Sequence, residues 1–279
     1  MAESTSSFSG KLALITGGSS GIGLALSRLL AAEGARVWIL ARRPELLQAA
    51  VSSLASANGN KPGMLAADVT KLDQVQAAVE RIKQEAGVPD LLINAAGAAH
   101  AGYAQETPLA LFHEMMDLNY FGIVNTVMTV LPDMLRRGSG YIVNFSSGAG
   151  FLALFGYAAY IPSKFAVRGL SDSLRLELKP LGIRVSVVFP PDTDTPGMES
   201  ENKTKPFETL EAFSSKLLPA DKVARSVLRG MKRGQYVILP GAEVDLWYRL
   251  TYLLGNAIYP LGDLVLGQAR RKKAKLEKG

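Results

Sequence analysis

Short hydrophobic runs recur along the chain, and stretches with helical periodicity separate them. The runs are continuous and rich in Leu, Ile and Val, which is typical of strands buried on both faces of a sheet. They cover residues 11–16, 36–41, 64–67, 91–93, 141–145, 184–189 and 236–239. Apolar residues every three or four positions predict amphipathic helices at 24–33, 72–85, 108–135, 160–178 and 220–231. Strands that alternate with helices indicate an α/β fold with a doubly wound parallel sheet.

A glycine-rich turn joins the first predicted strand to the first predicted helix. Residues without side chains let the backbone approach a pyrophosphate, and the helix N-terminus offers unpaired N–H groups and a positive dipole end. A strand before and a helix after this turn are the context of a Rossmann-type dinucleotide fold. We therefore expect the turn to bind a dinucleotide through Gly17, Ser19, Ser20, Gly21, Ile22 and Gly23.

Arg42 and Arg43 follow the second predicted strand directly. In a βαβ nucleotide unit this position meets the adenosine ribose, where an acid holds the 2′-hydroxyl and an arginine suits a 2′-phosphate. No acid is present here, so the sequence favours NADP(H) over NAD(H). The alternative is a solvated arginine pair at the start of a helix.

Tyr160 and Lys164 stand four positions apart in a predicted helix. Residues four apart lie on one helix face, so a phenol and an ammonium can act on the same small volume. Ser147 follows the strand at 141–145, at the sheet edge where α/β proteins place binding groups. This arrangement favours a carbonyl-reducing site, and the alternative is an incidental spacing on an amphipathic helix.

Three further features surround this predicted site. Asn119 lies among apolar residues in the helix expected at 108–135, and a buried amide must find partners, so it is either a local structural residue or part of the site. Residues 190–197 are too rich in proline for regular structure, and Asp192 or Asp194 there is a candidate partner for a substrate cation. Residues 198–218 are polar and then amphipathic, like a lid over a pocket.

The composition fits one large folded domain. The chain has 279 residues, of which 48% are hydrophobic and 20% charged. The formal charge of +6 comes mostly from residues 270–278, so we expect no nucleic-acid-binding face. The chain has no cysteine, and its two histidines lack the spacing of metal ligands, so we expect no metal site.

The chain divides at about residue 240 into a Rossmann-type body, residues 1–240, and an apolar extension, residues 241–279. Residues 246–266 combine leucines and aromatic residues with polar interruptions at Arg249, Asn256, Pro260 and Asp263. Aromatic residues beside a basic cluster favour a segment that lies on a membrane surface. The alternatives are a subunit interface or a cover over the pocket.

Residues 8–240 resemble the classical short-chain dehydrogenases/reductases. The motifs are Thr16-Gly17-x-x-x-Gly21-x-Gly23, the sheet-stabilising Asn94-Ala95-Ala96-Gly97, and the ordered set Asn119, Ser147, Tyr160 and Lys164. The resemblance implies that this set is a catalytic tetrad. It also implies cofactor contacts by Asp68 and Val69 at the adenine, by Thr195 at the nicotinamide, and by Asn94, Tyr160 and Lys164.

The tetrad implies a division of roles. By this resemblance we expect Tyr160 to donate the proton, Ser147 to hydrogen-bond the reacting oxygen, Lys164 to hold the nicotinamide ribose, and Asn119 to anchor a water that relays protons. A phenol with a pKa of about 10 is a poor donor near neutrality. We expect the cations of Lys164 and the nicotinamide to lower the pKa of Tyr160.

Residues 154–156, 190–197 and 201–206 resemble the members of this family that reduce long-chain keto sphingoid bases. The resemblance implies NADPH-dependent reduction of such a ketone at the cytoplasmic face of a membrane, by a homo-oligomer. The alternatives are reduction of another lipid ketone, such as a steroid, a retinoid or a 3-ketoacyl thioester, or a non-catalytic NADP-binding sensor.

Overall fold

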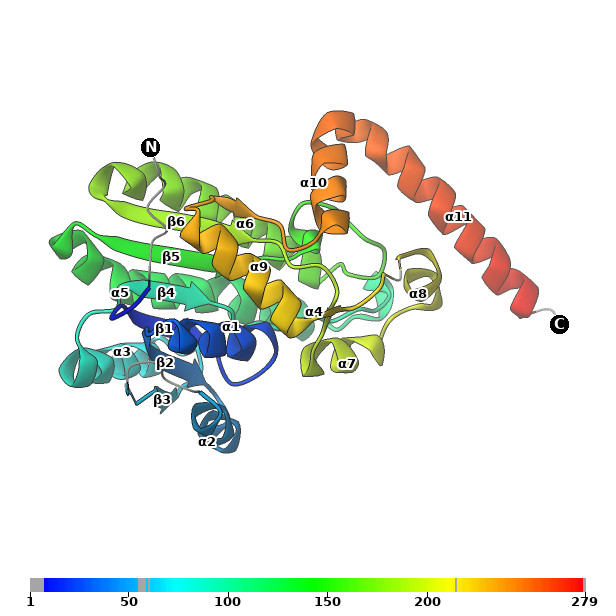
Figure 1. Cartoon of the computed structure of the whole chain (residues 1–279). Coiled ribbons are helices and arrows are strands. Elements are labelled where there is room, and N and C mark those ends of the chain that lie inside the picture. Colours follow the sequence, from blue (N-terminus) through cyan, green and yellow to red (C-terminus); the bar gives the residue numbers. More distant parts are fainter. Residues whose placement is uncertain (1–7, 55–58, 60, 214, 278–279) are drawn as a thin grey trace.

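The computed structural model describes residues 8–54, 59, 61–213 and 215–277. Its centre is a seven-stranded parallel sheet in the order β3-β2-β1-β4-β5-β6-β9 (Figure 1). The strands are β1 (Leu12–Thr16), β2 (Arg36–Ala41), β3 (Gly63–Ala66), β4 (Leu91–Asn94), β5 (Gly140–Phe145), β6 (Ile183–Val188) and β9 (Val237–Ile238). The predicted doubly wound, Rossmann-type parallel sheet is therefore confirmed.

Helices cover both faces of the sheet. One face carries α1 (Gly21–Ala32), α2 (Pro44–Ser52) and α9 (Ala220–Lys232), and the other carries α3 (Leu72–Ala86), α5 (Gly122–Arg137) and α6 (Tyr160–Leu178). Alternate residues of one strand serve opposite layers: Ala13 and Ile15 pack under α1, whereas Leu12 and Leu14 pack under α3 and α5. Strands buried on both faces explain the unbroken hydrophobic runs.

The strand order reverses between β1 and β4, which lie side by side with Thr16 opposite Asn94. The turn after β1 and the loop after β4 therefore leave the same edge of the sheet. This is the topological switch point at which open α/β sheets bind ligands.

The helix expected at 108–135 is one continuous rod in which the hydrogen-bond pattern changes. It consists of α4 (Leu109–Met116), a π-helical turn (Asp117–Phe121) and α5. The extra residue in a π turn rotates the side chains that follow it. The sequence did not predict this turn, and Asn119 lies within it.

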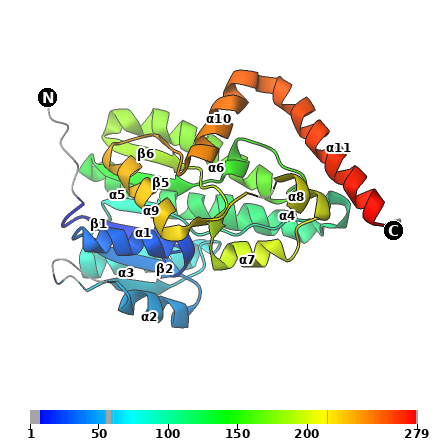
Figure 2. The ribbon, with the colours of Figure 1, turned by 45° about the vertical axis from the view of Figure 1, so that its right-hand side comes forward.

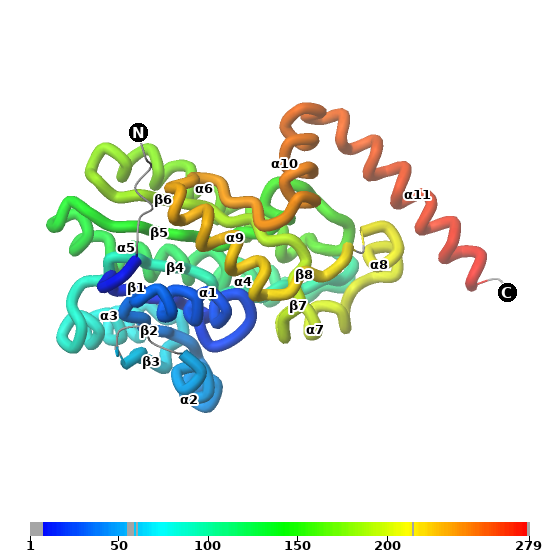
Figure 3. Tube along the Cα trace, in the orientation of Figure 1, coloured from blue at the N-terminus to red at the C-terminus, as the bar shows by residue number. Residues whose placement is uncertain are grey.

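Residues 190–218 contain more regular structure than the prolines suggested. The short strand β7 (Thr193–Asp194) pairs with β8 (Leu218–Pro219), and Pro196 begins α7 (Pro196–Asn202), where a missing N–H is tolerated. α8 (Phe207–Phe213) follows. Figure 3 shows this segment beyond the end of the sheet, beside the start of α9.

The C-terminal extension consists of α10 (Ala242–Leu254) and α11 (Ile258–Leu276). α10 rises from the body after β9, and α11 folds back toward α8 (Figures 1 and 2). In the described part of the chain, none of the helices combines the length and hydropathy needed to cross a bilayer.

Candidate active site

A large cavity opens at the switch-point edge of the sheet. Its volume is about 910 Å³. The glycine turn after β1, the loop after β4 and the loop after β5 line one half, together with Tyr160 and Lys164 from the start of α6. The structure thus brings together Ser147, Tyr160 and Lys164 from separate elements.

Ser147 and Tyr160 share a hydrogen bond at the centre of this wall. The Ser147 hydroxyl also accepts a hydrogen bond from the Ala149 N–H, at 3.1 Å, so its orientation is fixed from the protein side. Burial raises the pKa of Tyr160, the bond with Ser147 acts in the opposite direction, and Glu201 and Asp192 raise the pKa further. Among the protein's own groups burial dominates, so the pKa of Tyr160 lies above its usual value. The lowering expected from Lys164 and the nicotinamide together stays a prediction.

Lys164 is almost fully buried, with 5% of its surface exposed. Its amine donates to the Phe145 carbonyl at 3.1 Å and lies 5.8 Å from the ring centroid of Tyr160. Burial lowers the pKa of Lys164 to about 8, because desolvation disfavours the ammonium form. The group is therefore mostly charged at neutrality and close to the point at which it releases a proton.

Asn119 is fully buried behind the cavity wall. Its Oδ1 accepts from Ala98 N at 3.0 Å, and its Nδ2 donates to Ala98 O at 2.9 Å and to Ser163 Oγ at 3.0 Å. Both amide hydrogens are thus used. The second lone pair of Oδ1 is the one position left for the water that the resemblance implies.

Gly97 lies where these two groups approach each other. A Cβ at this position would lie 2.8 Å from Asn119 Oδ1 and 3.3 Å from Lys164 Nζ. The absence of a side chain at Gly97 therefore lets the amide and the ammonium share one small space. From the sequence alone, Gly97 was identified only as the end of a sheet-stabilising motif.

The glycine turn has the shape that a dinucleotide pyrophosphate needs. Gly17 and Gly21 have φ of +68° and +53°, and a Cβ at Gly17 would lie 2.7 Å from the backbone of Ala96. The first turn of α1 has no side-chain cap, so its N–H groups are open to a ligand. Thr195 packs against this turn: a Cβ at Gly21 would lie 3.1 Å from its methyl group.

The other predicted cofactor residues lie at the same edge in different settings. Ser20, Ile22 and Gly23 line the cavity, and Ser19 is not among the lining residues. Asp68 caps its own loop by accepting from Thr70 N at 2.9 Å. Val69 is held through its carbonyl, which accepts from Asn125 Nδ2 at 2.9 Å. These contacts fix the loop after β3 near the glycine turn.

Asn94 is a structural residue rather than a side-chain ligand. It is 1% exposed. Its amide donates to Asn144 Oδ1 at 2.9 Å and accepts from Thr126 Oγ1 at 2.7 Å. The amide of this side chain is therefore committed inside the sheet, and the cofactor contact expected at Asn94 stays a prediction.

Arg42 and Arg43 follow β2 and are both exposed. Among the described residues, neither guanidinium forms an ion pair. Exposed guanidinium groups without an ion-pair partner, at the end of the strand next to the glycine turn, can bind a phosphate.

The comparisons with known proteins agree with this geometry. Residues 11–206 match the family model described as short chain dehydrogenase. The chain belongs to the short-chain dehydrogenase family.

Relatives and solved structures support this membership. This short-chain dehydrogenase is 39% identical to a 3-dehydrosphinganine reductase of Danio rerio over 85% of this chain and 73% of that one. It is also 39% identical to a 3-ketodihydrosphingosine reductase of Dictyostelium discoideum, over 92% of this chain and 82% of that one. A short-chain dehydrogenase/reductase of Burkholderia phymatum in complex with NAD superposes with a TM-score of 0.79 at 26% identity, covering 89% of this chain and 95% of that chain.

The Dictyostelium alignment covers more of this chain than residues 1–240 can supply, so it includes part of the C-terminal extension. The solved actinorhodin polyketide ketoreductase with NADPH matches the fold as well, with a TM-score of 0.75 at 27% identity over 84% of this chain and 97% of that chain.

The second half of the dehydrogenase cavity comes from the segment expected to be like a lid, residues 198–218, and from the C-terminal extension. α7 and α8 form one side, and the extension closes the other with Val244, Trp247, Ile258, Tyr259, Leu261, Val265 and Leu266. The apolar pattern of residues 246–266 was the available signal. Of the alternatives weighed for that segment, the structure supports a cover over the pocket.

Ion pairs hold α11 against α8. Lys272 pairs with Glu211 at 2.7 Å, and Lys273 pairs with Glu208 at 3.3 Å. Tyr103 donates to Glu208 at 2.7 Å and so ties the loop after β4 to the same cluster. Part of the basic segment at 270–278 is therefore engaged within the protein.

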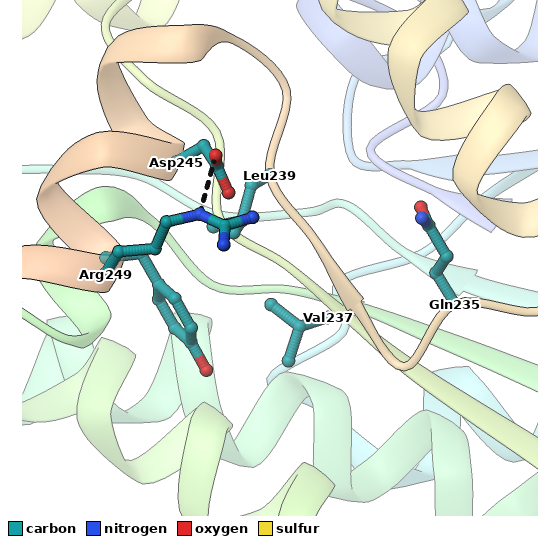
Figure 4. Close-up of a pocket in the computed structure, with 6 residues that line it drawn as sticks. Gln235, Val237, Leu239, Asp245 and Arg249 are labelled. Atoms are coloured by element: carbon teal, nitrogen blue, oxygen red, sulfur yellow. Dashed lines mark hydrogen bonds and ion pairs between the residues drawn. The ribbon is translucent and has the colours of Figure 1, made fainter. Parts of the chain in front are cut away.

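A smaller hollow of about 370 Å³ lies between β9 and α10 (Figure 4). Its charged groups are Asp245 and Arg249, which pair with each other at 2.9 Å. Since each neutralises the other, this hollow offers no charge to a ligand. We therefore assign the chemistry of the dehydrogenase to the large cavity.

The close approach at Gly97 gives a test of the site. We expect Gly97→Ala to displace Asn119 and Lys164 and to lower the rate of ketone reduction by about 10- to 100-fold, as misplacement by a fraction of an ångström does. The matched control is Gly169→Ala on α6, where a Cβ meets nothing within 4 Å. Steady-state kinetics and thermal melting of both variants make the comparison. Equal activities would show that the packing around Gly97 does not position the tetrad.

Proposed function

We propose that this chain reduces the ketone of 3-ketodihydrosphingosine to give dihydrosphingosine, with NADPH as the reductant. The observation that carries the proposal is the cavity itself: Ser147, Tyr160 and Lys164 face one half of it, and apolar side chains of α8, α10 and α11 line the other half. A polar head group and a long alkyl tail need such a divided site. The same substrate is supported by the reductases of Danio rerio and Dictyostelium discoideum, which are similar to this chain over most of its length.

The protein's own groups act on the ketone oxygen. Tyr160 donates the proton, and Ser147 donates a hydrogen bond that orients the oxygen. Lys164 holds the ribose side of the cofactor and stabilises negative charge on the phenol as its proton leaves. Asn119 fixes Ala98 and Ser163 and so keeps this wall in place. Bound NADPH supplies the hydride to the carbonyl carbon.

Arg42 supports the choice of NADPH over NADH. It lies just after β2, the strand beside the glycine turn, and no carboxylate occupies that position. A 2′-phosphate there would meet a guanidinium, whereas an acid would be needed to hold a free 2′-hydroxyl.

The apolar half of the cavity supports a long-chain substrate. Each methylene of a tail buried there contributes roughly 0.8 kcal/mol. Catalytic efficiency should therefore rise with tail length until the apolar half of the cavity is filled.

We also propose that the extension rests on the cytoplasmic face of a membrane. Leucines on its outer surface are exposed, among them Leu253 at 81% and Leu264 at 57%. Arg271 and Lys275 on α11 are exposed as well and suit anionic head groups. A keto sphingoid base partitions into bilayers, so a cavity covered by this arm would receive its substrate there.

A homo-oligomer fits the exposed apolar side chains of α4, α5 and α6, which include Leu109, Met128 and Phe165. Sedimentation analysis that gives a monomer would contradict this assignment.

The substrate and the acid are tested together. We expect wild-type protein to oxidise NADPH in the presence of 3-ketodihydrosphingosine, with kcat/KM rising as the tail lengthens, and Tyr160→Phe to lose at least ~100-fold in turnover while it still binds NADPH. Steroid, retinoid and 3-ketoacyl thioester substrates are run alongside. Equal or better activity on one of these would replace the sphingoid assignment, and an active Tyr160→Phe variant would remove the phenol from the mechanism.

Cofactor choice is tested at the arginine pair. Arg42→Asp should weaken NADPH relative to NADH by about tenfold or more, which corresponds to ~1.4 kcal/mol of binding free energy. Titrations of both cofactors measure the change, and Arg43→Asp is the matched variant. A switch in Arg43→Asp alone would assign the phosphate to Arg43.

Membrane attachment is tested on the outer face of the extension, because removing the whole extension would also open the cavity. Leu253→Ser combined with Leu264→Ser should reduce sedimentation with anionic liposomes several-fold, and salt should weaken binding of the intact protein by screening its basic residues. Leu181→Ser is the control, since Leu181 is 52% exposed at the end of α6. Wild-type protein that stays in the supernatant at low salt would disprove the attachment.

A further inference from the structure

Two carboxylates lie in the cavity wall close to Tyr160. They belong to Asp192, on the loop after β6, and Glu201, on α7. Both act electrostatically on the Tyr160 phenol, Glu201 more strongly than Asp192. The reduction of a ketone by the tetrad uses neither group.

Tyr157 connects Glu201 to the catalytic tyrosine. The ring of Tyr157 lies 5.9 Å from that of Tyr160, centroid to centroid, and its hydroxyl donates to Glu201 Oε1. The same carboxylate pairs with Lys205 at 3.1 Å, and the two side chains are only 10% and 9% exposed. Glu201 is therefore a buried carboxylate held in place one side chain away from the proton donor.

Each carboxylate keeps one oxygen free. Glu201 Oε1 contacts both the Tyr157 hydroxyl and the Lys205 amine, whereas Glu201 Oε2 has no partner in the part of the chain that the structure describes. Ser215 donates to Asp192 Oδ2 at 3.0 Å, which leaves Oδ1 unpaired. No side-chain oxygen in the described part of the chain is both sealed from solvent and unpaired, so Oε2 and Oδ1 are accessible to solvent, and both residues line the cavity.

The charges in this part of the wall do not balance. Asp192 and Glu201 carry two negative charges, and in the described part of the chain Lys205 is the one cation that forms an ion pair with either of them. An uncompensated negative charge in a partly buried site is costly unless a ligand cation offsets it. The free oxygens are the acceptors that an ammonium group needs.

We propose that Glu201, assisted by Asp192, binds the ammonium group of a 2-amino ketone and makes the site selective for such substrates over neutral ketones. This inference rests on the proposed function. In 3-ketodihydrosphingosine the carbon that bears the ammonium is bonded to the carbonyl carbon. A group that binds this ammonium must therefore lie next to the proton donor, as Glu201 does.

Binding the ammonium also prepares the acid. Before a substrate binds, Glu201 and Asp192 raise the pKa of Tyr160 in addition to the effect of burial. A substrate cation between the carboxylates and the phenol offsets their charge, so Tyr160 gives up its proton more readily. A neutral ketone offers no such compensation, and the selectivity therefore affects turnover as well as affinity.

The test compares two substrates that differ in one group: 3-ketodihydrosphingosine and 1-hydroxyoctadecan-3-one, which has hydrogen in place of the amine. We expect the wild type to prefer the amino ketone in kcat/KM by at least tenfold. The variant Glu201→Gln with Lys205→Met removes both charges of the buried pair and avoids stranding the lysine. This double variant should lose most of the preference, because its kcat/KM falls for the amino ketone and not for the neutral ketone. Asp192→Asn, which leaves the ion pair intact, should lose part of it.

Asp194→Asn is the matched control. Asp194 lies two residues from Asp192 on the same segment but is exposed and outside the cavity wall. The Asp194→Asn variant should therefore prefer the amino ketone as strongly as the wild type does. NADPH binding and thermal melting check that each variant is folded. If the double variant does not fold, the substrate preference of Asp192→Asn tests the inference. Equal wild-type activity on both ketones, or equal losses on both in the variants, would overturn the inference and leave the reductase. A wild type inactive on both would overturn the proposed function as well.

Discussion

The buried ammonium of Lys164 is the group around which the catalytic half of the protein is built. Removing an ammonium from water is costly, and the lowered pKa of Lys164 expresses that cost directly. The protein offsets it with one direct hydrogen bond to the end of β5, at Phe145 O. Because that bond needs the strand end and the start of α6 at a fixed distance, the position of Lys164 depends on the register of the whole sheet.

The π-helical turn solves a packing problem that follows from this burial. Asn119 must place its amide behind the loop after β4, where it bonds Ala98 and Ser163, and the loop must come close to Lys164. A regular helix would rotate the amide away, and a side chain at Gly97 would keep the groups apart. Local distortion of one helix and one missing Cβ thus serve the same site.

The two halves of the cavity are held in different ways. The catalytic half is fixed by the sheet and by buried hydrogen bonds such as that from Asn94 to Asn144. The other half is closed by α11, which partly exposed ion pairs at Glu208 and Glu211 hold against α8. Ion pairs of this kind contribute little and respond to salt. The closure of this half therefore depends on ionic strength more than that of the catalytic half does.

The sequence by itself determined the sheet, the glycine turn and the order of the tetrad. Hydrophobic runs of strand length and the spacing of Tyr160 and Lys164 are local patterns, and local geometry is enough to interpret them. It did not determine the pKa of Tyr160, because burial depends on how the loops close over the phenol. It also could not name the side-chain partners of Asn94, which lie 32 and 50 residues away. The place of the apolar extension over the cavity, the position of Glu201 in the cavity wall and the π turn at Asn119 were decided only by tertiary structure. Each depends on contacts between elements that are distant in the chain.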